Sequence, residues 1–230
     1  MWGETEMKIL VLNCGSSSVK YKLFDLGQGV EEVLASGIVE EVGLGAPSLK
    51  HSRPGQEKLV RDALAARDHR EAIGAILDIL VDLEYGVLRT VEEVDAVGHR
   101  VVHGGERFSA SVEISQQVFE VLYDNIPLAP LHNPPNIQGI EAMAALLPDR
   151  PQVAVFDTAF HQTMEPEAYL YAIPYRFYKE YGIRRYGFHG TSHKYVARQA
   201  AGHLGRPLEQ LKIITCLLYT SDAADDLLQV

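Results

Sequence analysis

Hydrophobic and polar residues alternate near the start of the chain in the manner of β-strands. Residues 8–12 form a continuous β-branched and leucine-rich run, which is typical of a buried strand. After a small polar turn at 13–18, Val19, Tyr21 and Leu23 on one side of a second strand alternate with Lys20, Lys22 and Phe24 on the other. These two segments predict a hairpin with a Gly- and Ser-rich tip, and residues 33–39 predict a third strand.

A helical period follows. Residues 61–81 predict a helix, because their apolar side chains recur at the i, i+3, i+4 and i+7 positions of a stripe that faces a core. Residues 94–102 return to strand character. Ser115 is expected to cap a short helix that carries Val118, Val121 and Leu122.

Prolines then divide the chain. Their density between residues 126 and 136 predicts an extended, rigid connection. Asn133 before Pro134 predicts an N-cap with proline at the first helical position. Farther on, residues 153–156 predict a buried strand, 194–203 a helix capped by Ser192, and 212–216 another strand. This alternation indicates the α/β class, with an N-terminal domain at 7–150 and the start of a second domain at 151–216.

Composition narrows the class of protein. The chain has 230 residues, of which 47% are hydrophobic and 23% charged, the proportions of a folded globular protein. Its net charge of -10 argues against a nucleic-acid partner, which requires a basic face. No apolar run reaches membrane-spanning length, and residues 1–6, interpreted as a leader, lack the basic start of a signal peptide. With two distant cysteines and no disulfide framework, we expect a cytoplasmic protein without a membrane partner.

Residues 13–20 are the first candidate binding segment. A Gly- and Ser-rich turn offers backbone N–H groups and hydroxyls to a phosphate, and Lys20 adds a positive charge. The segment matches neither the Walker A pattern nor G-x-G-x-x-G. An ordinary solvent-exposed hairpin turn is therefore the alternative interpretation.

Two charged residues interrupt or end apolar strands. The Arg100 guanidinium must be paired with an anionic ligand or with a buried carboxylate, and the local sequence favours neither. Asp157 follows the run 153–156, where open α/β sheets bind ligands, although aspartate also caps turns well. His99 and His103 would lie about 13 Å apart on one strand face, too far for a shared metal.

The remaining candidates are histidines. His132 lies in the proline-rich segment, either as a positioning residue or as ordinary packing. His189 and His193 have the i, i+4 spacing of zinc ligands, but Gly190 stands where the zincin motif has glutamate. A donor to developing negative charge is the better functional interpretation of His189, with a packed core histidine as the alternative.

Five segments in this order resemble the acetate kinase family: Asn-Cys-Gly-Ser-Ser-Ser (13–18), Gly-His-Arg-Val-Val-His-Gly-Gly (98–105), Pro-Leu-Ala-Pro-Leu-His-Asn-Pro (127–134), Phe-Asp-Thr-Ala-Phe-His (156–161) and Tyr-Gly-Phe-His-Gly-Thr-Ser-His (186–193). The resemblance extends from about Met7 to Cys216, about the first half of a full-length member. It implies a fold of the sugar kinase, Hsp70 and actin (ribonuclease H-like) superfamily, with the active site between two α/β domains. It also implies reversible phosphoryl transfer from ATP to acetate, giving acetyl phosphate and ADP.

The resemblance implies a role for each matching residue. These are Asn13 as the metal-associated residue, Ser16, Ser18 and Lys20 as phosphate and nucleotide contacts, Arg100 as the acetate-binding arginine, Val102, Leu131 and Phe188 as the pocket around the acetate methyl, Asp157 as the essential carboxylate, and His132 and His189 as transition-state-stabilising histidines. It further implies Mg²⁺, with Mn²⁺ as a substitute, and a homodimer formed largely through the second domain. Because acetate is already ionised at pH 7, we expect Asp157 to act through its charge rather than as a base.

Residues 217–230 depart from the family pattern. They contain no glycine and do not continue as the His-Leu-Gly-Asn-Gly type of phosphate loop that the family implies. We interpret this tail as a sequence artefact and expect the chain as given to be an incomplete, inactive fragment. A propionate or other short-chain acyl kinase is the close alternative, because one methylene changes binding by only about 1–3 kcal/mol. A zinc-dependent hydrolase that uses His189 and His193 is the alternative from another class.

Overall fold

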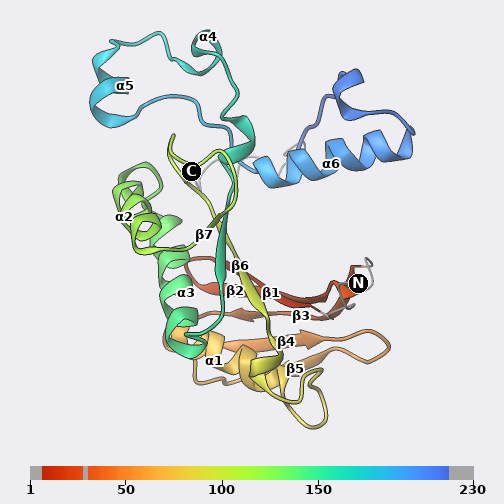
Figure 1. Ribbon diagram of the computed structural model, residues 1–230. Coiled ribbons are helices and arrows are strands. Elements are labelled where there is room, and N and C mark those ends of the chain that lie inside the picture. Colours follow the sequence, from red (N-terminus) through yellow and green to blue (C-terminus); the bar gives the residue numbers. More distant parts are fainter. Residues whose placement is uncertain (1–6, 28–30, 218–230) are drawn as a thin grey trace.

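The computed structural model describes residues 7–27 and 31–217 (Figure 1). Its strands are β1 (Lys8–Cys14), β2 (Ser18–Asp25), β3 (Glu32–Glu40), β4 (Ser48–Ser52), β5 (Leu59–Arg61), β6 (Ala96–Val101), β7 (Val112–Glu113) and β8 (Gln152–Phe156). Its α-helices are α1 (His69–Leu80), α2 (Gln116–Asp124), α3 (Asn133–Leu146), α4 (Pro166–Tyr169), α5 (Arg176–Tyr181) and α6 (Gly190–His203). Short 3-10 helices span Val91–Glu93, Ile126–Leu128, Ala159–His161 and Leu208–Gln210.

The strands form one sheet in the order β5-β4-β3-β2-β1-β6-β8-β7. β1 to β5 are antiparallel neighbours, and the predicted β1–β2 hairpin is confirmed, with Lys8 opposite Asp25 and Cys14 opposite Val19. The predicted third strand is confirmed as β3. On the other side of β1 the pairing becomes parallel, from β1 to β6 and from β6 to β8. The carboxyl ends of β1, β6 and β8 therefore lie at one edge of the sheet.

α1 and α3 pack beside one another against one face of the sheet (Figure 1). The predicted alternation in β2 is confirmed, because Val19, Tyr21 and Leu23 point into this core and are buried. A second, smaller core joins α2 and α3 to the ends of β6 and β8. There the predicted cap is confirmed, since the Ser115 hydroxyl accepts a hydrogen bond from the Val118 N–H at 3.4 Å.

The predicted helix over 61–81 is wrong in its first turns. Residues 59–61 pair with β4 as strand β5, with Leu59 opposite His51. The helix begins at His69, because the Asp68 carboxylate accepts a hydrogen bond from the Glu71 N–H at 2.8 Å and caps it there. Of the residues predicted as helix, Arg61 is the end of this strand, and residues 62–68 form bends and irregular backbone before α1.

Four predictions on the later elements are also corrected. The proline-rich segment 126–136 is not extended, because it begins with a 3-10 helix at 126–128 and its last four residues open α3. Asn133 is the first residue of α3 and His132 its N-cap, because the Asn133 side chain bonds to the backbone of another loop. α6 begins at Gly190, so Ser192 lies inside the first turn rather than at the cap. Residues 212–216 form no strand, since no neighbouring strand in the described part of the chain pairs with them.

The expected division into domains stays a prediction. β8 lies beyond residue 150 yet pairs with β6, so the proposed boundary falls between two strands of one sheet. The leader at 1–6 and nearly all of the tail at 217–230 lie outside the described residues. Within the described ranges, no helix is both long enough and apolar enough to cross a membrane.

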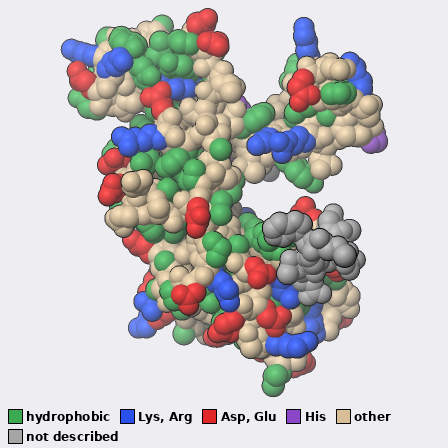
Figure 2. All heavy atoms as spheres, viewed as in Figure 1, with side chains coloured by type: hydrophobic (Ala, Val, Ile, Leu, Met, Phe, Trp, Pro, Cys, Tyr) green, Lys and Arg blue, Asp and Glu red, His purple; other side chains and the backbone are tan. Residues whose placement is uncertain are grey.

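Beyond β8 the chain extends away from the sheet. Figure 2 shows the α4–α5 segment and α6 as two separate projections, with a notch between α6 and the body of the sheet. Apolar side chains are exposed on both projections, among them Tyr171, Tyr175, Tyr181, Tyr195 and Val196.

Candidate active site

The candidate site lies at the edge where β1, β6 and β8 end. Asn13 comes from β1, Arg100 from β6, and Asp157 directly follows β8. These strands are parallel, and open α/β sheets bind ligands beyond the carboxyl ends of such strands. The sheet thus brings together three polar side chains that are up to 144 positions apart in the sequence.

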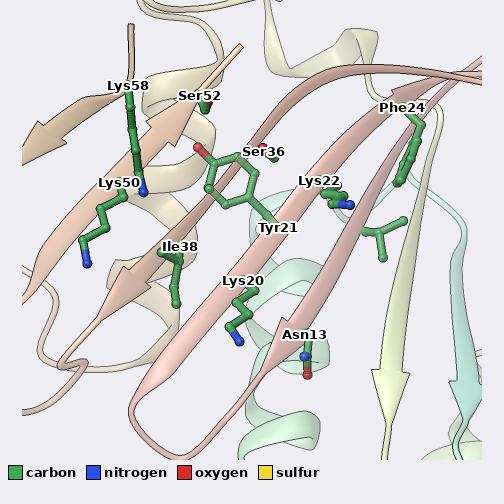
Figure 3. Close-up of a pocket in the computed structure, with 12 residues that line it drawn as sticks. Asn13, Lys20, Tyr21, Lys22, Phe24, Ser36, Ile38, Lys50, Ser52 and Lys58 are labelled. Atoms are coloured by element: carbon green, nitrogen blue, oxygen red, sulfur yellow. The ribbon is translucent and has the colours of Figure 1, made fainter. Parts of the chain in front are cut away.

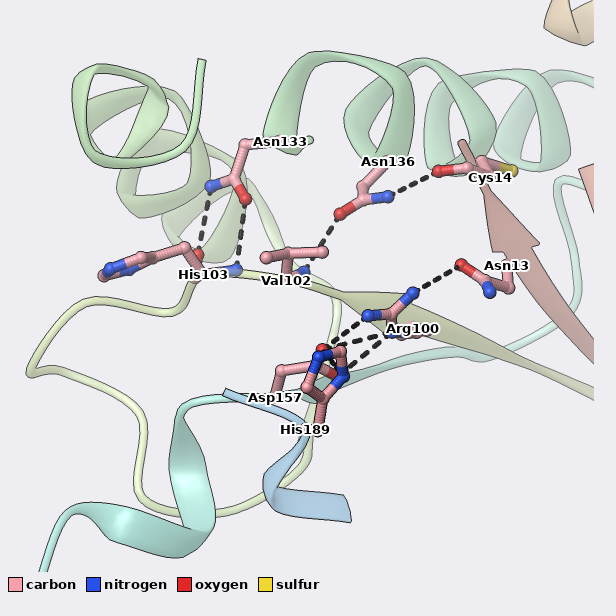
Figure 4. Close-up of polar contacts among 9 residues, drawn as sticks. All are labelled: Asn13, Cys14, Arg100, Val102, His103, Asn133, Asn136, Asp157 and His189. Atoms are coloured by element: carbon pink, nitrogen blue, oxygen red, sulfur yellow. Dashed lines mark hydrogen bonds and ion pairs between the residues drawn. The ribbon is translucent and has the colours of Figure 1, made fainter. Parts of the chain in front are cut away.

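Arg100 and Asp157 form the centre of this site (Figure 4). The Arg100 Nη2 lies 2.6 Å from Asp157 Oδ2, and Nε donates to both carboxylate oxygens at 3.1 and 3.2 Å. Nη1 donates to Asn13 Oδ1 at 3.2 Å. The Asp157 side chain is buried at 3% exposure, whereas that of Arg100 is 37% exposed. Of the two partners left open by the sequence, the structure shows the carboxylate, and part of the guanidinium still faces solvent.

His189 approaches the same carboxylate from α6. Its Nδ1 lies 4.0 Å from Asp157 Oδ2. The residue has a left-handed backbone with φ of 54°, and the next N–H, that of Gly190, donates to the Asp157 carbonyl at 2.8 Å. The start of α6 is therefore tied to the end of β8, which holds the His189 ring at the site.

The segment between β1 and β2 forms a compact loop beside Asn13. The Gly15 N–H donates to the Ser18 carbonyl at 2.8 Å, and His69 Nε2 donates to the Gly15 carbonyl at 2.7 Å. Burial of Cys14 at the base of the loop raises the pKa of its thiol to about 12, so it stays protonated at neutral pH. The bond from His69 thus fixes the backbone of this serine loop, and its serine residues line the site.

One hollow of about 700 Å³ is lined by every residue to which the family resemblance gives a role. Its lining includes Asn13, Ser16, Ser18, Lys20, Arg100, Val102, Leu131, His132, Asp157, Phe188 and His189. The structure therefore brings the eleven candidates together, whereas their individual roles stay predictions. Sequence reasoning missed further lining residues, namely Gly15, Ser17, Leu128, Ala129 and Pro130. Their place inside the quoted segments 13–18 and 127–134 was the available signal.

Two buried histidines lie close to Arg100 in the sequence. His103 packs edge-on against the rings of Tyr186 and Phe188, with centroids 4.3 and 5.6 Å away. Burial lowers its pKa to about 4 and also lowers that of His99 to about 4. Both are therefore neutral at pH 7, and His99 Nε2 donates to Gln152 Oε1 at 2.7 Å.

The two histidines of the zinc hypothesis have different partners. His189 faces Asp157, whereas His193 Nδ1 lies 2.6 Å from Thr215 Oγ1 and its ring packs edge-on against His161. In residues 7–27 and 31–217, no group of three or more His, Cys, Asp and Glu side chains could hold a metal ion. The pair thus lacks a third ligand of these types in the described part of the chain.

A second hollow of about 580 Å³ lies on the sheet face opposite α1 (Figure 3). Lys20, Lys22, Lys50 and Lys58 line it together with Ser36, Ile38 and Phe24. It shares Asn13 and Lys20 with the first hollow, so Lys20 stands between the two.

Comparisons with known proteins give the family. The profile of the Acetokinase family matches residues 8–222. The acetate kinase of Carboxydothermus hydrogenoformans is 58% identical over 212 residues, which are 92% of this chain and 52% of that protein. The acetate kinase of Clostridioides difficile is 53% identical over 92% of this chain and 53% of its own length. The chain thus spans about half the length of the curated relatives it matches.

Solved structures agree with the sequence matches. The acetate kinase of Porphyromonas gingivalis has a TM-score of 0.83 at 51% identity, covering 88% of this chain and 50% of that one. A propionate kinase from Francisella tularensis has a TM-score of 0.79 at 42% identity, covering 87% and 50%. The expected fold of the sugar kinase, Hsp70 and actin superfamily is therefore confirmed. By sequence profile, sequence identity and fold, the chain belongs to the acetokinase family.

Proposed function

We propose that this chain supplies the acyl-binding and phosphate-binding half of a kinase that transfers a phosphoryl group reversibly from ATP to acetate. The products are acetyl phosphate and ADP. The observation that carries the proposal is the half-exposed Arg100 guanidinium, fixed by Asp157 beside a Gly- and Ser-rich loop in one hollow. Phosphoryl transfer asks a protein mainly for positioning and charge neutralisation, and these residues provide both.

We propose that Arg100 binds the carboxylate group of acetate. A guanidinium has five N–H groups, and the bonds to Asp157 and Asn13 use Nε–H and one hydrogen on each terminal nitrogen. In the described part of the chain, one hydrogen on each terminal nitrogen is left to donate to acetate. Acetate is ionised at pH 7, so it attacks the phosphorus without help from a base. Asp157 accordingly orients Arg100 and His189 through its charge.

The other residues surround the reacting groups. We propose that Val102, Leu131 and Phe188 contact the acyl methyl group and that Ser16, Ser18 and Lys20 bind phosphate oxygens. His132 and His189 would donate hydrogen bonds to the equatorial oxygens of the moving phosphoryl group, where negative charge is spread. All of these residues line the same hollow.

Magnesium is best described here as part of the nucleotide substrate. Mg²⁺, or Mn²⁺, would neutralise charge on the ATP phosphates when bound. Asn13 Oδ1 and the Asp157 carboxylate lie in the hollow beside the serine hydroxyls, and both already accept hydrogen bonds from Arg100. Two such side chains fit an ion that keeps its waters and phosphate ligands, and not a cage made of protein groups alone.

The acyl preference is proposed as acetate, with propionate as the second candidate. The structural match to a propionate kinase at 42% identity supports propionate as the second candidate. We further propose a cytoplasmic homodimer for the full-length protein. Because the chain spans about half the length of its relatives, we expect no measurable phosphoryl transfer from the 230 residues alone.

Acetate binding to the 230-residue chain tests the proposal. Titration with ¹³C-acetate should show saturable binding by NMR, and Arg100→Ala should abolish it while Arg100→Lys weakens it, since a lysine cannot hold a carboxylate bidentately. Arg107→Ala is the matched control, because Arg107 is exposed and lies outside the hollow. Equal binding by the wild type and Arg100→Ala, both folded by circular dichroism, would refute the proposed carboxylate site.

A further inference from the structure

Helix α3 presents a row of three residues to the ends of β1 and β6. Asn133, Asn136 and Gly139 recur at every third position, so they lie along one side of its first two turns. The Asn133 amide exchanges hydrogen bonds of 3.1 and 3.0 Å with the His103 backbone. Gly139 lies so close to Cys14 that an added Cβ would come within 2.3 Å of its Sγ. Side chains and backbone of α3 therefore contact the ends of both strands directly, and Figure 4 shows the hydrogen bonds of Asn133 and Asn136.

Asn136 contacts the two strand ends at once. Its Oδ1 accepts a hydrogen bond from the Val102 N–H at 3.0 Å, and its Nδ2 donates to the Cys14 carbonyl at 2.7 Å. The residue is 3% exposed. A side-chain amide carries a donor and an acceptor on neighbouring atoms, so it can bridge an N–H and a carbonyl that face one another.

The bridge begins where the backbone pairing of the two strands stops. The parallel register of β1 and β6 ends at Leu12 opposite His99, before Cys14 and Val102 are reached. Past that point, the Arg100 to Asn13 contact of 3.2 Å is another direct link between the two segments. Cys14 opens the serine loop, and Val102 lines the hollow next to Arg100. Asn136 therefore fixes the distance between the proposed phosphate loop and one wall of the proposed acyl pocket.

We propose that Asn136 is a positioning residue that determines which acyl group the site accepts, an inference that rests on the proposed function. With the bridge in place, Val102 stands at a fixed distance from the loop, and the space beside Arg100 suits a small acyl group. Without it, the Val102 N–H and the Cys14 carbonyl lose a buried partner, and the two segments move apart to reach water. Val102 then lies farther from the loop, and the site discriminates less strongly against a longer acyl chain.

Paired titrations of the 230-residue chain test this inference. ¹³C-acetate and ¹³C-propionate would be titrated into the wild type, Asn136→Ser and Asn136→Asp. Serine cannot span the gap, and aspartate keeps an acceptor for Val102 but cannot donate to Cys14. We expect acetate affinity to fall about fivefold, the effect of one lost hydrogen bond, and the acetate-to-propionate affinity ratio to fall by about threefold.

Asn125→Ser is the matched control. Asn125 is also buried, but its Nδ2 donates to the Val121 carbonyl of the preceding helix α2, and its side chain lies against Gly105 rather than between the ends of β1 and β6. This variant should lower stability yet leave the acetate-to-propionate ratio at the wild-type value. Loss of both affinities by one common factor in the Asn136 variants, or an equal change of the ratio in Asn125→Ser, would overturn the inference.

A ligand-free measurement separates this inference from the proposed function. If the wild type binds neither acid, the proposed function fails, and backbone amide NMR shifts of Asn136→Ser decide about the bridge. Shifts at both 14–18 and 100–103 would support a link between the two segments. Shifts confined to one of them would overturn it.

Discussion

The Arg100–Asp157 pair combines a buried carboxylate with a half-exposed guanidinium. We predict that Arg100→Ala lowers the free energy of unfolding by about 3 kcal/mol at pH 7, because it leaves the Asp157 carboxylate buried without its cation. Asp157→Asn should cost less, since the remaining arginine still reaches solvent. Urea unfolding of both variants, with exposed Arg107→Ala as control, measures the difference. If the urea midpoint of Arg100→Ala equals that of the wild type, the buried Asp157 carboxylate does not depend on Arg100 as its charge partner.

His99 predicts a pH dependence of stability. Its pKa is about 4 in the folded chain because of burial, below the ordinary value of 6.5. Between these pH values the unfolded chain binds a proton that the folded chain does not, so stability decreases as pH falls from 6.5 towards 4. The loss from this group approaches about 3 kcal/mol near pH 4. In urea unfolding at several pH values, the free energy of unfolding of His99→Gln should fall less steeply with decreasing pH than that of the wild type. The contribution of His103 should remain. An unchanged pH dependence would contradict the assignment of this loss to His99.

Chemistry-bearing residues were found from sequence, but their supporting contacts were not. The motifs named Asp157 and Arg100 because charged groups in apolar strands require an explanation. Nothing local shows that Asn136 reaches a carbonyl 122 positions away, or that Asn133 bonds to a loop instead of capping its own helix. Asparagine at a helix start is read as a cap because local geometry favours one, and here a tertiary partner competes successfully for the amide.

At the scale of the element, α3 and α1 each contain a glycine, and the two should respond oppositely to alanine. A Cβ at Gly74 in α1 meets nothing within 4 Å, so Gly74→Ala should stabilise the chain by about 1 kcal/mol through helix propensity. At Gly139 in α3 the same Cβ would clash with Cys14 Sγ, so Gly139→Ala should destabilise it. Thermal unfolding compares the two variants.

Cys14→Ala provides the internal check on that comparison. Removing the sulfur should rescue Gly139→Ala and leave the effect of Gly74→Ala unchanged, because Gly74 does not contact Cys14. Stabilisation by Gly139→Ala in the wild-type background would contradict the close packing of α3 on β1.

Elements defined by local signals were predicted well, and those that depend on partners were not. The β1–β2 hairpin and the Ser115-capped α2 follow from alternation and from a cap residue, which are local. Arg61, predicted as the first residue of a helix, instead ends a strand that pairs with β4, and residues 212–216 form no strand because no described strand pairs with them. Pairing is a tertiary property that a window of sequence does not contain.

At the scale of the whole molecule, stability should be uneven along the chain. The sheet carries large buried side chains such as Leu10, Leu12 and Leu23, whereas α6 buries only Gly190, Ala197 and Ala201. We predict by hydrogen-exchange mass spectrometry that β1, β2 and β6 exchange slowly and that peptides from α6 onward exchange faster. Uniform protection across residues 8–203 would contradict this prediction.

The most direct test of the central claim is acetyl phosphate formation, trapped as hydroxamate. The 230-residue chain would be compared with a version in which residues after Cys216 are replaced by the second half of the Carboxydothermus relative. We predict that the extended chain forms the acyl hydroxamate from ATP and acetate, that Asp157→Asn removes most of this rate, and that the 230 residues alone form none. A folded extended chain that binds acetate but phosphorylates no short-chain carboxylate would contradict the claim that this hollow belongs to an acyl kinase.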